Sequence, residues 1–332
     1  DGLKLREEKA LAEYCEEHKE EIGFWKFMQY EFFKQWNKVK AYANEKGIKI
    51  IGDIPIYVAF DSADTWANPG LFQLDEDNIP KAVAGCPPDS FSADGQLWGN
   101  PIYDWEKMKK SGFAWWIKRL GAAKHMYDIV RFDHFRGFES YWSIPAGDKT
   151  AMNGHWEKGP GYELFDTVKK KLGKQNIIAE DLGFLTPSVI KLVKKTGFPG
   201  MKILEFAFDS KEDNDYRPHN YEKNCVVYTG THDNDTVMGW FQTCSKRDRA
   251  RTLRYLGVKT AKNVSWDMIR LAMESVADTA VIPMQDYLAL GSEARINTPS
   301  TLGGNWEWRM EEDAYTAELA EKIKKLTKLY GR

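Results

Sequence analysis

The first part of the chain, from about residue 3 to residue 44, has the hydrophobic spacing of a long helix. Apolar side chains recur there every three or four residues, as they do along one face of an α-helix. Gly47 follows directly, at the position where a glycine commonly caps the C-terminal end of a helix. The residues that carry the spacing are Phe24, Met28, Phe32, Trp36 and Val39.

Short apolar runs rich in β-branched residues follow along the rest of the chain. Their nearly continuous apolar character is typical of strands that are covered on both faces. The predicted strands lie at 48–58, 128–135, 176–183, 201–208, 225–233 and 279–290. The predicted helices between them lie at about 105–126, 161–173, 187–196, 236–257 and 265–277.

This alternation of strands and helices predicts βαβ units and a parallel sheet, because a parallel neighbour needs a crossover that a helix usually supplies. The alternatives are a doubly wound sheet and a (β/α)8 TIM barrel. No glycine-rich phosphate loop follows the first strand, and polar residues gather at the C-terminal ends of the strands, which favours the barrel. Only six of the eight strands are found, so we expect the barrel to lack its first two βα units in this chain.

Two long segments rich in Gly, Pro, Asp and aromatic residues interrupt the pattern, at 61–104 and at 291–309. Loops of such length usually have a function or form a small subdomain. We therefore expect residues 1–332 to form a partial catalytic barrel, with 61–104 as an inserted lid or subdomain after the first strand. From about Met310 the chain predicts a charged amphipathic helix on the outside of the protein.

Charge and composition exclude several classes of partner. The 47 basic and 49 acidic residues nearly cancel and form no basic stripe, which argues against nucleic acid and anionic membranes. No apolar run reaches the roughly 18 residues of a membrane span, and no signal-peptide core is present at the start. The chain begins with Asp1, which leaves a processed or truncated start open. Four scattered cysteines indicate reduced thiols and a cytoplasmic location.

No cofactor or metal is expected. The acidic run at 209–215 lacks the central Gly and the terminal Glu of a calcium loop, so a solvated loop is the better interpretation. Aromatic residues, by contrast, are abundant at 14%, and several of the 13 tryptophans lie in polar loops. They indicate either an aromatic-rich core or surfaces for the apolar faces of sugar rings. The loop tryptophans are Trp66, Trp98, Trp142, Trp306 and Trp308.

Two carboxylates at the ends of neighbouring strands are candidates for catalysis. Arg131 and Asp133 are two apart in a strand and so point to the same side. The guanidinium would keep Asp133 ionised, as a nucleophile requires, although a buried ion pair is the simpler alternative. Glu180 ends the next strand, where desolvation would raise its pKa as a proton donor requires. The alternative for Glu180 is a residue that merely caps the loop.

Asp233 follows His232 at the end of another predicted strand, and read alone these two residues could simply belong to a loop. Together, Asp133, Glu180 and Asp233 predict acidic groups at one rim of a barrel, around a single sugar ring. Two carboxylates suffice for glycosidic bond cleavage, and a third can stabilise an oxocarbenium-like transition state. A retaining mechanism predicts carboxyl groups of Asp133 and Glu180 roughly 5–5.5 Å apart.

Five motifs in a fixed order resemble those of the 4-α-glucanotransferases, or amylomaltases, of glycoside hydrolase family 77. The resemblance extends over essentially the whole chain and its motifs are highly specific. The motifs are GDIPIYVAFDSADTWANP (52–69), QLWGNPIYDW (96–105), VRFDHFRG (130–137), AEDLG (179–183) and GTHDN (230–234).

The resemblance implies a retaining double displacement that transfers glucan segments between maltooligosaccharides. In it, Asp133 would be the nucleophile, Glu180 the general acid/base and Asp233 the group that binds the donor ring and stabilises the transition state. Arg131 would support the nucleophile, and residues 87–92 resemble a flexible loop that covers the site. The further residues that it implies as glucan contacts are His134, His232, Tyr57, Asp61, Gln96, Trp98 and Asn297.

The sequence departs from this family in one respect: two further strands and an N-terminal insertion that family members have are not seen here. The missing part would be supplied by a further N-terminal segment or by a partner chain. Two other functions therefore stay open, an α-amylase-type hydrolase that uses water as acceptor and an inactive glucan-binding fragment.

Overall fold

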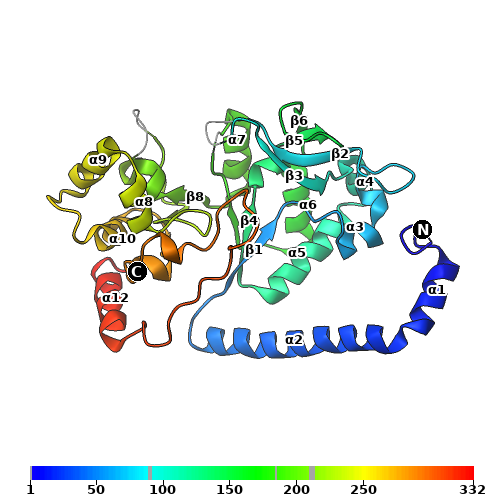
Figure 1. The fold of residues 1–332 in the computed structure, drawn as a ribbon, viewed down its shortest axis with the longest axis horizontal. Coiled ribbons are helices and arrows are strands. Elements are labelled where there is room, and N and C mark those ends of the chain that lie inside the picture. The colour runs from blue at the N-terminus through cyan, green and yellow to red at the C-terminus, as the bar shows by residue number, and fades with distance from the viewer. Residues whose placement is uncertain (1, 89–91, 184, 209–213) are drawn as a thin grey trace. The chain divides into compact units, whose positions relative to one another are not determined.

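The computed structural model describes residues 2–88, 92–183, 185–208 and 214–332. The chain divides into two compact units, Asp1–Phe198 and Pro199–Arg332, and each is described by itself (Figure 1). Both units combine helices with a parallel sheet, as the alternating pattern predicts.

A parallel three-stranded sheet lies at the centre of the first unit. Its strands β1 (Ile51–Pro55), β4 (Ile129–Asp133) and β7 (Ile177–Ala179) are hydrogen-bonded in the order β1-β4-β7. Helix α5 (Ala114–Met126) leads into β4, and α6 (Tyr162–Leu172) leads into β7. The parallel order predicted from the sequence is confirmed here, and the register sets Asp53 opposite Arg131.

A second, antiparallel sheet in this unit was not expected from the sequence. Its order is β3-β2-β5-β6, and β2 and β3 come from the segment 61–104 that we interpreted as an insertion. These strands are short, β2, β3 and β5 include glycine or proline and β6 is mostly polar, so they lack the continuous apolar runs that marked the parallel strands. Their bounds are β2 (Ala82–Cys86), β3 (Gln96–Pro101), β5 (Ser140–Pro145) and β6 (His155–Lys158).

Two of the predicted helices after the N-terminal region are each divided in two. The helix expected at 105–126 is α4 (Trp105–Lys110) followed by α5, and Gly112 and Phe113 between them have φ values of 64° and 57°. Left-handed residues cannot continue a right-handed helix. The helix expected at 236–257 likewise divides at Cys244, where Ser245 caps a new helix. Its parts are α8 (Val237–Thr243) and α9 (Lys246–Leu256).

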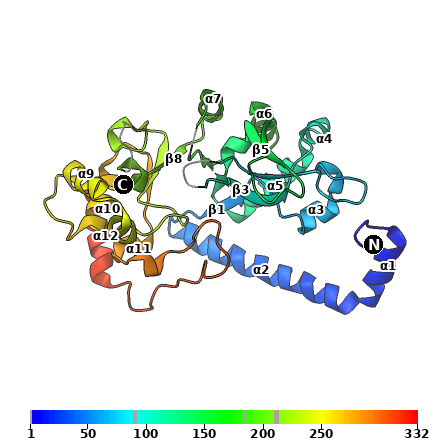
Figure 2. The ribbon, with the colours of Figure 1, turned by 45° about the horizontal axis from the view of Figure 1, so that its top comes forward.

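The N-terminal region is helical as predicted, but the single helix expected over about 3–44 is two helices, α1 (Glu8–Glu17) and α2 (Lys19–Glu45), that divide at His18, with Gly47 in the left-handed conformation just beyond. Figures 1 and 2 show α2 as a long helix that stands clear of the strands of its unit. Trp36 Nε1 donates to the carbonyl of Met126 at 2.9 Å, near the end of α5. The apolar face of α2 is otherwise exposed in the described part of the chain: Phe24 is 55% exposed and Phe32 49%.

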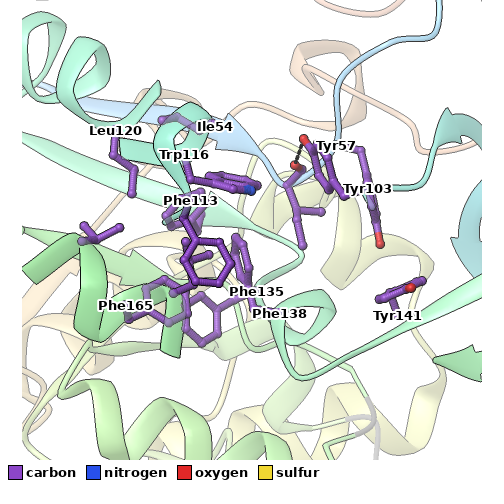
Figure 3. Packing of buried hydrophobic residues seen from close by; sticks show 14 of the residues in the cluster. Ile54, Tyr57, Tyr103, Phe113, Trp116, Leu120, Phe135, Phe138, Tyr141 and Phe165 are labelled. Carbon is purple, nitrogen blue, oxygen red and sulfur yellow. Dashed lines mark hydrogen bonds between the residues drawn. The ribbon is translucent and has the colours of Figure 1, made fainter. Parts of the chain in front are cut away.

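Aromatic rings fill the core beside β4 (Figure 3). Phe132 of β4 packs edge-on against Phe138 at 5.1 Å, and Phe138 lies 5.3 Å from Trp116 of α5. Phe135 stacks on Phe165 of α6 at 5.1 Å. Such offset and edge-to-face contacts stabilise more than the buried area alone. Phe132 and Phe135 flank Asp133 and His134 in the sequence, so this core fixes the backbone at the end of β4.

The second unit contains another parallel sheet, in the order β10-β9-β8. The predicted strand at 279–290 was too long: β10 ends at Val281, and the short helix α11 (Met284–Tyr287) follows Pro283. Proline favours the first turn of a helix and lacks the N–H that a strand needs. The strands predicted at 201–208 and 225–233 are likewise shorter, as β8 (Gly200–Ile203) and β9 (Cys225–Tyr228).

The remaining predicted helices match the structure closely. The helices predicted at 187–196 and 265–277 and after Met310 are confirmed, the last of them from residue 317 onward. Among the described residues, no helix is long and apolar enough to cross a membrane. The remaining bounds are α3 (Ala63–Ala67), α7 (Pro187–Thr196), α10 (Val264–Glu274), β10 (Thr279–Val281), α12 (Ala317–Leu329) and the 3-10 turns η1 (Pro69–Leu71), η2 (Phe135–Phe138), η3 (Leu204–Ala207), η4 (Pro218–Asn220) and η5 (Ser292–Ala294).

The close approach of Tyr127 to β1 makes Gly52 a test of this packing. A Cβ at residue 52 would lie 2.2 Å from the Tyr127 ring, whereas a Cβ at Gly70 would meet nothing within 4 Å. We expect Gly52→Ala to lower the free energy of unfolding by about 1–3 kcal/mol, the usual cost of overpacking. Gly70→Ala is the matched control and should change it by less than about 1 kcal/mol. Urea unfolding of the complete gene product measures both, and equal values for the two variants would contradict the packing.

Candidate active site

An arginine joins a carboxylate in the middle of β1 to a carboxylate at the C-terminal end of β4. Arg131 Nη1 lies 2.6 Å from Oδ2 of Asp53, and Nη2 lies 3.1 Å from Oδ1 of Asp133. Burial alone would lower the pKa of Arg131, but Asp53 and Asp133 together raise it above its ordinary value. A permanent positive charge therefore lies against Asp133, as predicted from the two-residue spacing, and the Arg131 side chain is only 10% exposed.

Glu180 lies directly beyond β7, beside the end of β4. Its amide donates to the carbonyl of Phe132 at 3.0 Å, and its carbonyl accepts from the amide of Phe135 at 3.1 Å, so the two chains stay paired past the strands. The carboxyl oxygens accept from the amides of His134 (2.7 Å) and Leu182 (2.8 Å). Burial, with the charge of Asp133 next in importance, raises the pKa of Glu180 to about 7. The raised pKa expected from the sequence is thus found.

His134 turns the chain from β4 into η2 in the left-handed conformation, with φ 51°. This turn presents its amide to Glu180. Burial lowers the pKa of His134 to about 3, so its ring is neutral at physiological pH. Among the described residues its Nε2 atom is buried without a hydrogen-bond partner.

Three further predicted contacts gather beside His134. The Trp98 ring meets the His134 ring edge-on at 4.8 Å, and Trp98 Nε1 donates to Oε1 of Gln96 at 3.1 Å. Tyr57 lies 6.4 Å from Trp98 between ring centroids and is buried. Asp61, in contrast, is exposed in the turn before α3. Residues 89–91 of the predicted covering loop 87–92 lie outside the described residues.

In the second unit, the loop after β9 presents His232 and Asp233. Asn297 Nδ2 donates to Oδ1 of Asp233 at 2.6 Å, and His232 Nε2 lies 3.3 Å from its Oδ2. Arg295 donates to the carbonyl of Asp233 at 2.7 Å. The Trp306 ring lies 5.1 Å from the His232 ring and is 64% exposed. The structure thus brings together His232, Asp233 and Asn297, while the convergence of Asp233 with Asp133 and Glu180 stays a prediction.

Several residues that shape these groups were missed from the sequence. Asp53 is the only charged residue within the apolar run of β1, and a charge at such a place could have been read as a signal for a partner. Arg295 and Asp286 gave no such signal, because their contacts join segments far apart in the chain. Among the described residues no cluster could hold a metal ion, and residues 209–213 of the acidic run lie outside them.

Fold and site together define a class of protein. An α/β fold places two carboxyl groups at the ends of neighbouring parallel strands, one beside a fixed cation and one with a raised pKa. Enzymes that cleave or transfer glycosidic bonds use such a pair of carboxyl groups.

Comparison with known proteins specifies the family. The profile of the 4-alpha-glucanotransferases, glycoside hydrolase family 77, matches residues 1–315, and the chain belongs to this family. A 4-alpha-glucanotransferase of Clostridium butyricum is 54% identical over 99% of this chain and 68% of its own length. One of Streptococcus pneumoniae is 53% identical over 99% of this chain and 65% of its own length.

The fold agrees with a solved structure of the family. The amylomaltase from Streptococcus agalactiae in complex with acarbose has a TM-score of 0.97 and 44% identity, over 100% of this chain and 67% of that one. The resemblance seen in the motifs is therefore confirmed. The chain spans about two thirds of the length of these three relatives.

The raised pKa of Glu180 predicts a stability that depends on pH. The native state binds this proton more tightly than the unfolded chain, so the contribution of Glu180 to stability is greatest below about pH 4.5 and falls as pH rises through about 7. Glu180→Gln removes that dependence but loses a backbone hydrogen bond at every pH. We therefore expect the free energy of unfolding of the variant, relative to that of the parent, to rise by about 1–3 kcal/mol from pH 5 to pH 8. Urea unfolding at both values measures the gain, and a constant difference would contradict it.

The Asp53–Arg131 pair predicts that replacement of Asp53 lowers activity, although Asp53 would act only through Arg131. In Asp53→Asn, Arg131 loses one of its two ionic partners and can shift away from Asp133. We expect kcat for the family's transfer reaction to fall by about 10–100-fold, the usual effect of a small misplacement in an active site. Asp77→Asn, in an exposed turn, is the control. An unchanged kcat in Asp53→Asn would show that Arg131 needs no support from β1.

Proposed function

We propose that the protein is a 4-α-glucanotransferase that moves α-1,4-glucan segments between maltooligosaccharides by a retaining double displacement. The observation that carries this proposal is the contrast between Asp133, which lies against Arg131, and Glu180, whose pKa is raised to about 7. Two neighbouring carboxyl groups with opposite electrostatic environments supply a nucleophile and a proton donor.

In the first step, Asp133 attacks the anomeric carbon while Glu180 protonates the oxygen of the departing glucan. In the second step, the Glu180 carboxylate takes the proton of an incoming sugar hydroxyl as the bond to Asp133 breaks. A pKa of about 7 suits both duties, because the group is available in either state near neutral pH. The neutral His134 ring would bind the sugar through its Nε2 atom.

Asp233, held by Asn297, is proposed to bind the hydroxyls of the donor ring and to stabilise positive charge in the transition state. His232 would bind the same ring. Trp98 and Trp306 each lie beside one of the two histidines, which supports a role for both as surfaces for sugar rings. The remaining proposed glucan contacts are Tyr57, Asp61, Gln96 and the loop 87–92.

We further propose that the six parallel strands belong to a (β/α)8 barrel. In support, two of the three sheets are parallel and follow chain order, β1-β4-β7 and β8-β9-β10, and α-helices lie between β1 and β4, β4 and β7, β7 and β8, and β9 and β10. Two more strands would come from sequence beyond these 332 residues or from a partner chain, since about a third of each relative lies outside the matched stretch. The four cysteines, all of them thiols, support a cytoplasmic location.

Maltooligosaccharides are the proposed substrates, and the acarbose complex of the Streptococcus agalactiae amylomaltase supports binding of an oligosaccharide. Incubation of the complete gene product with maltotriose should yield glucose together with oligomers longer than maltotriose. Asp133→Asn should lower this turnover by at least about 10³-fold and leave the unfolding transition in place. Chromatography of the products over time measures both.

The pattern of products separates the alternatives. Reducing ends without longer oligomers would indicate a hydrolase that uses water as acceptor. Binding of maltotriose without any turnover by the parent would indicate a glucan-binding protein. Full activity of Asp133→Asn would remove Asp133 from the role of nucleophile.

A further inference from the structure

The short helix α11 buries two polar side chains that the proposed chemistry does not use. Gln285 is 5% exposed and Asp286 is 1% exposed. A buried carboxylate is costly unless several hydrogen bonds compensate for the lost solvent. The partners of these two side chains therefore show what the helix holds in place.

Asp286 joins the two ends of the loop that presents His232 and Asp233. Its Oδ2 atom accepts from the hydroxyl of Thr229 at 2.5 Å, just past β9. Its Oδ1 atom accepts from the amide of Val237 at 2.9 Å, at the start of α8. The helix is itself fixed from behind, because Ser265 Oγ donates to the carbonyl of Asp286 at 2.6 Å. Both ends of the loop 229–237 are thus held by one carboxylate.

Gln285 fixes the segment that meets this loop from the other side. Its Nε2 atom donates to the carbonyl of Ala294 at 3.2 Å. The next residues of that segment reach the loop: Arg295 donates to the carbonyl of Asp233, and the amide of Asn297 donates to the carbonyl of His232 at 3.1 Å. Consecutive residues of α11 therefore hold the loop and the segment that binds Asp233.

The loop also rests on a buried glutamic acid. A Cβ at Gly230 would lie 2.8 Å from Oε1 of Glu205, so the loop backbone packs directly on this side chain. That oxygen is buried without a hydrogen-bond partner among the described residues. Burial, followed by the charges of Asp286 and Asp235, raises the pKa of Glu205 well above its ordinary value. A protonated Glu205 is neutral, so it adds no second full negative charge near Asp286.

We propose that α11 is a positioning element: Asp286 and Gln285 hold the loop 229–237 and the segment 294–297 in the arrangement that orients Asp233. The inference rests on the proposed function for its catalytic consequence, but the anchoring of the loop can be tested without activity. It also gives a reason for the short helix where the sequence pattern predicts a continuous strand.

The test compares two replacements of Asp286 in the complete gene product. Asp286→Ala leaves the Val237 amide and the Thr229 hydroxyl without their acceptor. Asp286→Asn can still accept from the Val237 amide and can donate its amide hydrogen to the Thr229 oxygen. Thr252→Val is the matched control, since Thr252 is equally buried in this unit and its hydroxyl bonds only within α9, to the carbonyl of Asp248 at 2.8 Å. Thr229→Val, which removes one of the two bonds, replaces Asp286→Ala if that variant does not fold.

Hydrogen exchange and kinetics give separate readings. In Asp286→Ala we expect the amides of Asn234, Val237 and Asn297 to exchange at least about tenfold faster, and kcat to fall by about 100-fold with KM changed less than threefold. Asp286→Asn should restore kcat to within about fivefold of the parent, and Thr252→Val should change neither reading at the loop.

Unchanged exchange at the loop in Asp286→Ala would overturn the inference, as would an equal loss of kcat in Asp286→Ala and Thr252→Val. A parent without disproportionation would count against the proposed function alone, because faster exchange confined to Asp286→Ala would still support the anchoring by α11.

Discussion

The ion pair network of Arg131 with Asp53 and Asp133 is the interaction on which the electrostatics of the candidate site in the first unit depend. It exists only because β1 and β4 are parallel and in a register that sets Asp53 opposite Arg131. A guanidinium can bind two carboxylates at once through separate nitrogens, as it does here. The sheet therefore supplies both the position of Asp133 and the charge beside it.

The same sheet gives Glu180 the opposite environment. The backbone of β7 continues beside that of β4, so Glu180 is close enough to Asp133 for the carboxylate charge to raise its pKa. Burial acts in the same direction, while Arg131 and the two amide donors oppose it. The net effect is a pKa of about 7, because burial and the charge of Asp133 outweigh one guanidinium that is already shared by two carboxylates. One register of strands thus produces two carboxyl groups with different electrostatic environments.

The aromatic core explains how these positions can be held. Phe132 and Phe135 lie on either side of Asp133 and His134 in the sequence and are completely buried. Their packing against Phe138 and Phe165 resists movement of the intervening backbone, including the left-handed turn at His134. A non-glycine residue in that conformation costs about 1–3 kcal/mol, which the surrounding core offsets. The strained turn at His134 therefore depends on the burial of the aromatic rings beside it.

Sequence predicted the parts of this arrangement that depend on local pattern. The parallel strands, most helices and the pair Arg131–Asp133 follow from spacing of two and of three to four residues along the chain. The antiparallel sheet does not follow from such spacing, because its short strands are paired across long loops. Asp286 was missed for a related reason: its partner Thr229 is distant in sequence, and no local pattern records such a contact.

The overlong strand predicted at 279–290 shows where a local pattern gives the wrong answer. Its apolar and β-branched residues favour a strand, but Pro283 ends the ladder and starts α11. The polar residues Gln285 and Asp286 are then buried rather than placed at a strand end, and each finds its partners on other segments. A buried polar side chain is tolerated only when such partners exist. Where the pattern fails, the cause is thus a set of long-range hydrogen bonds, and those bonds lie next to the residues with the proposed chemical roles.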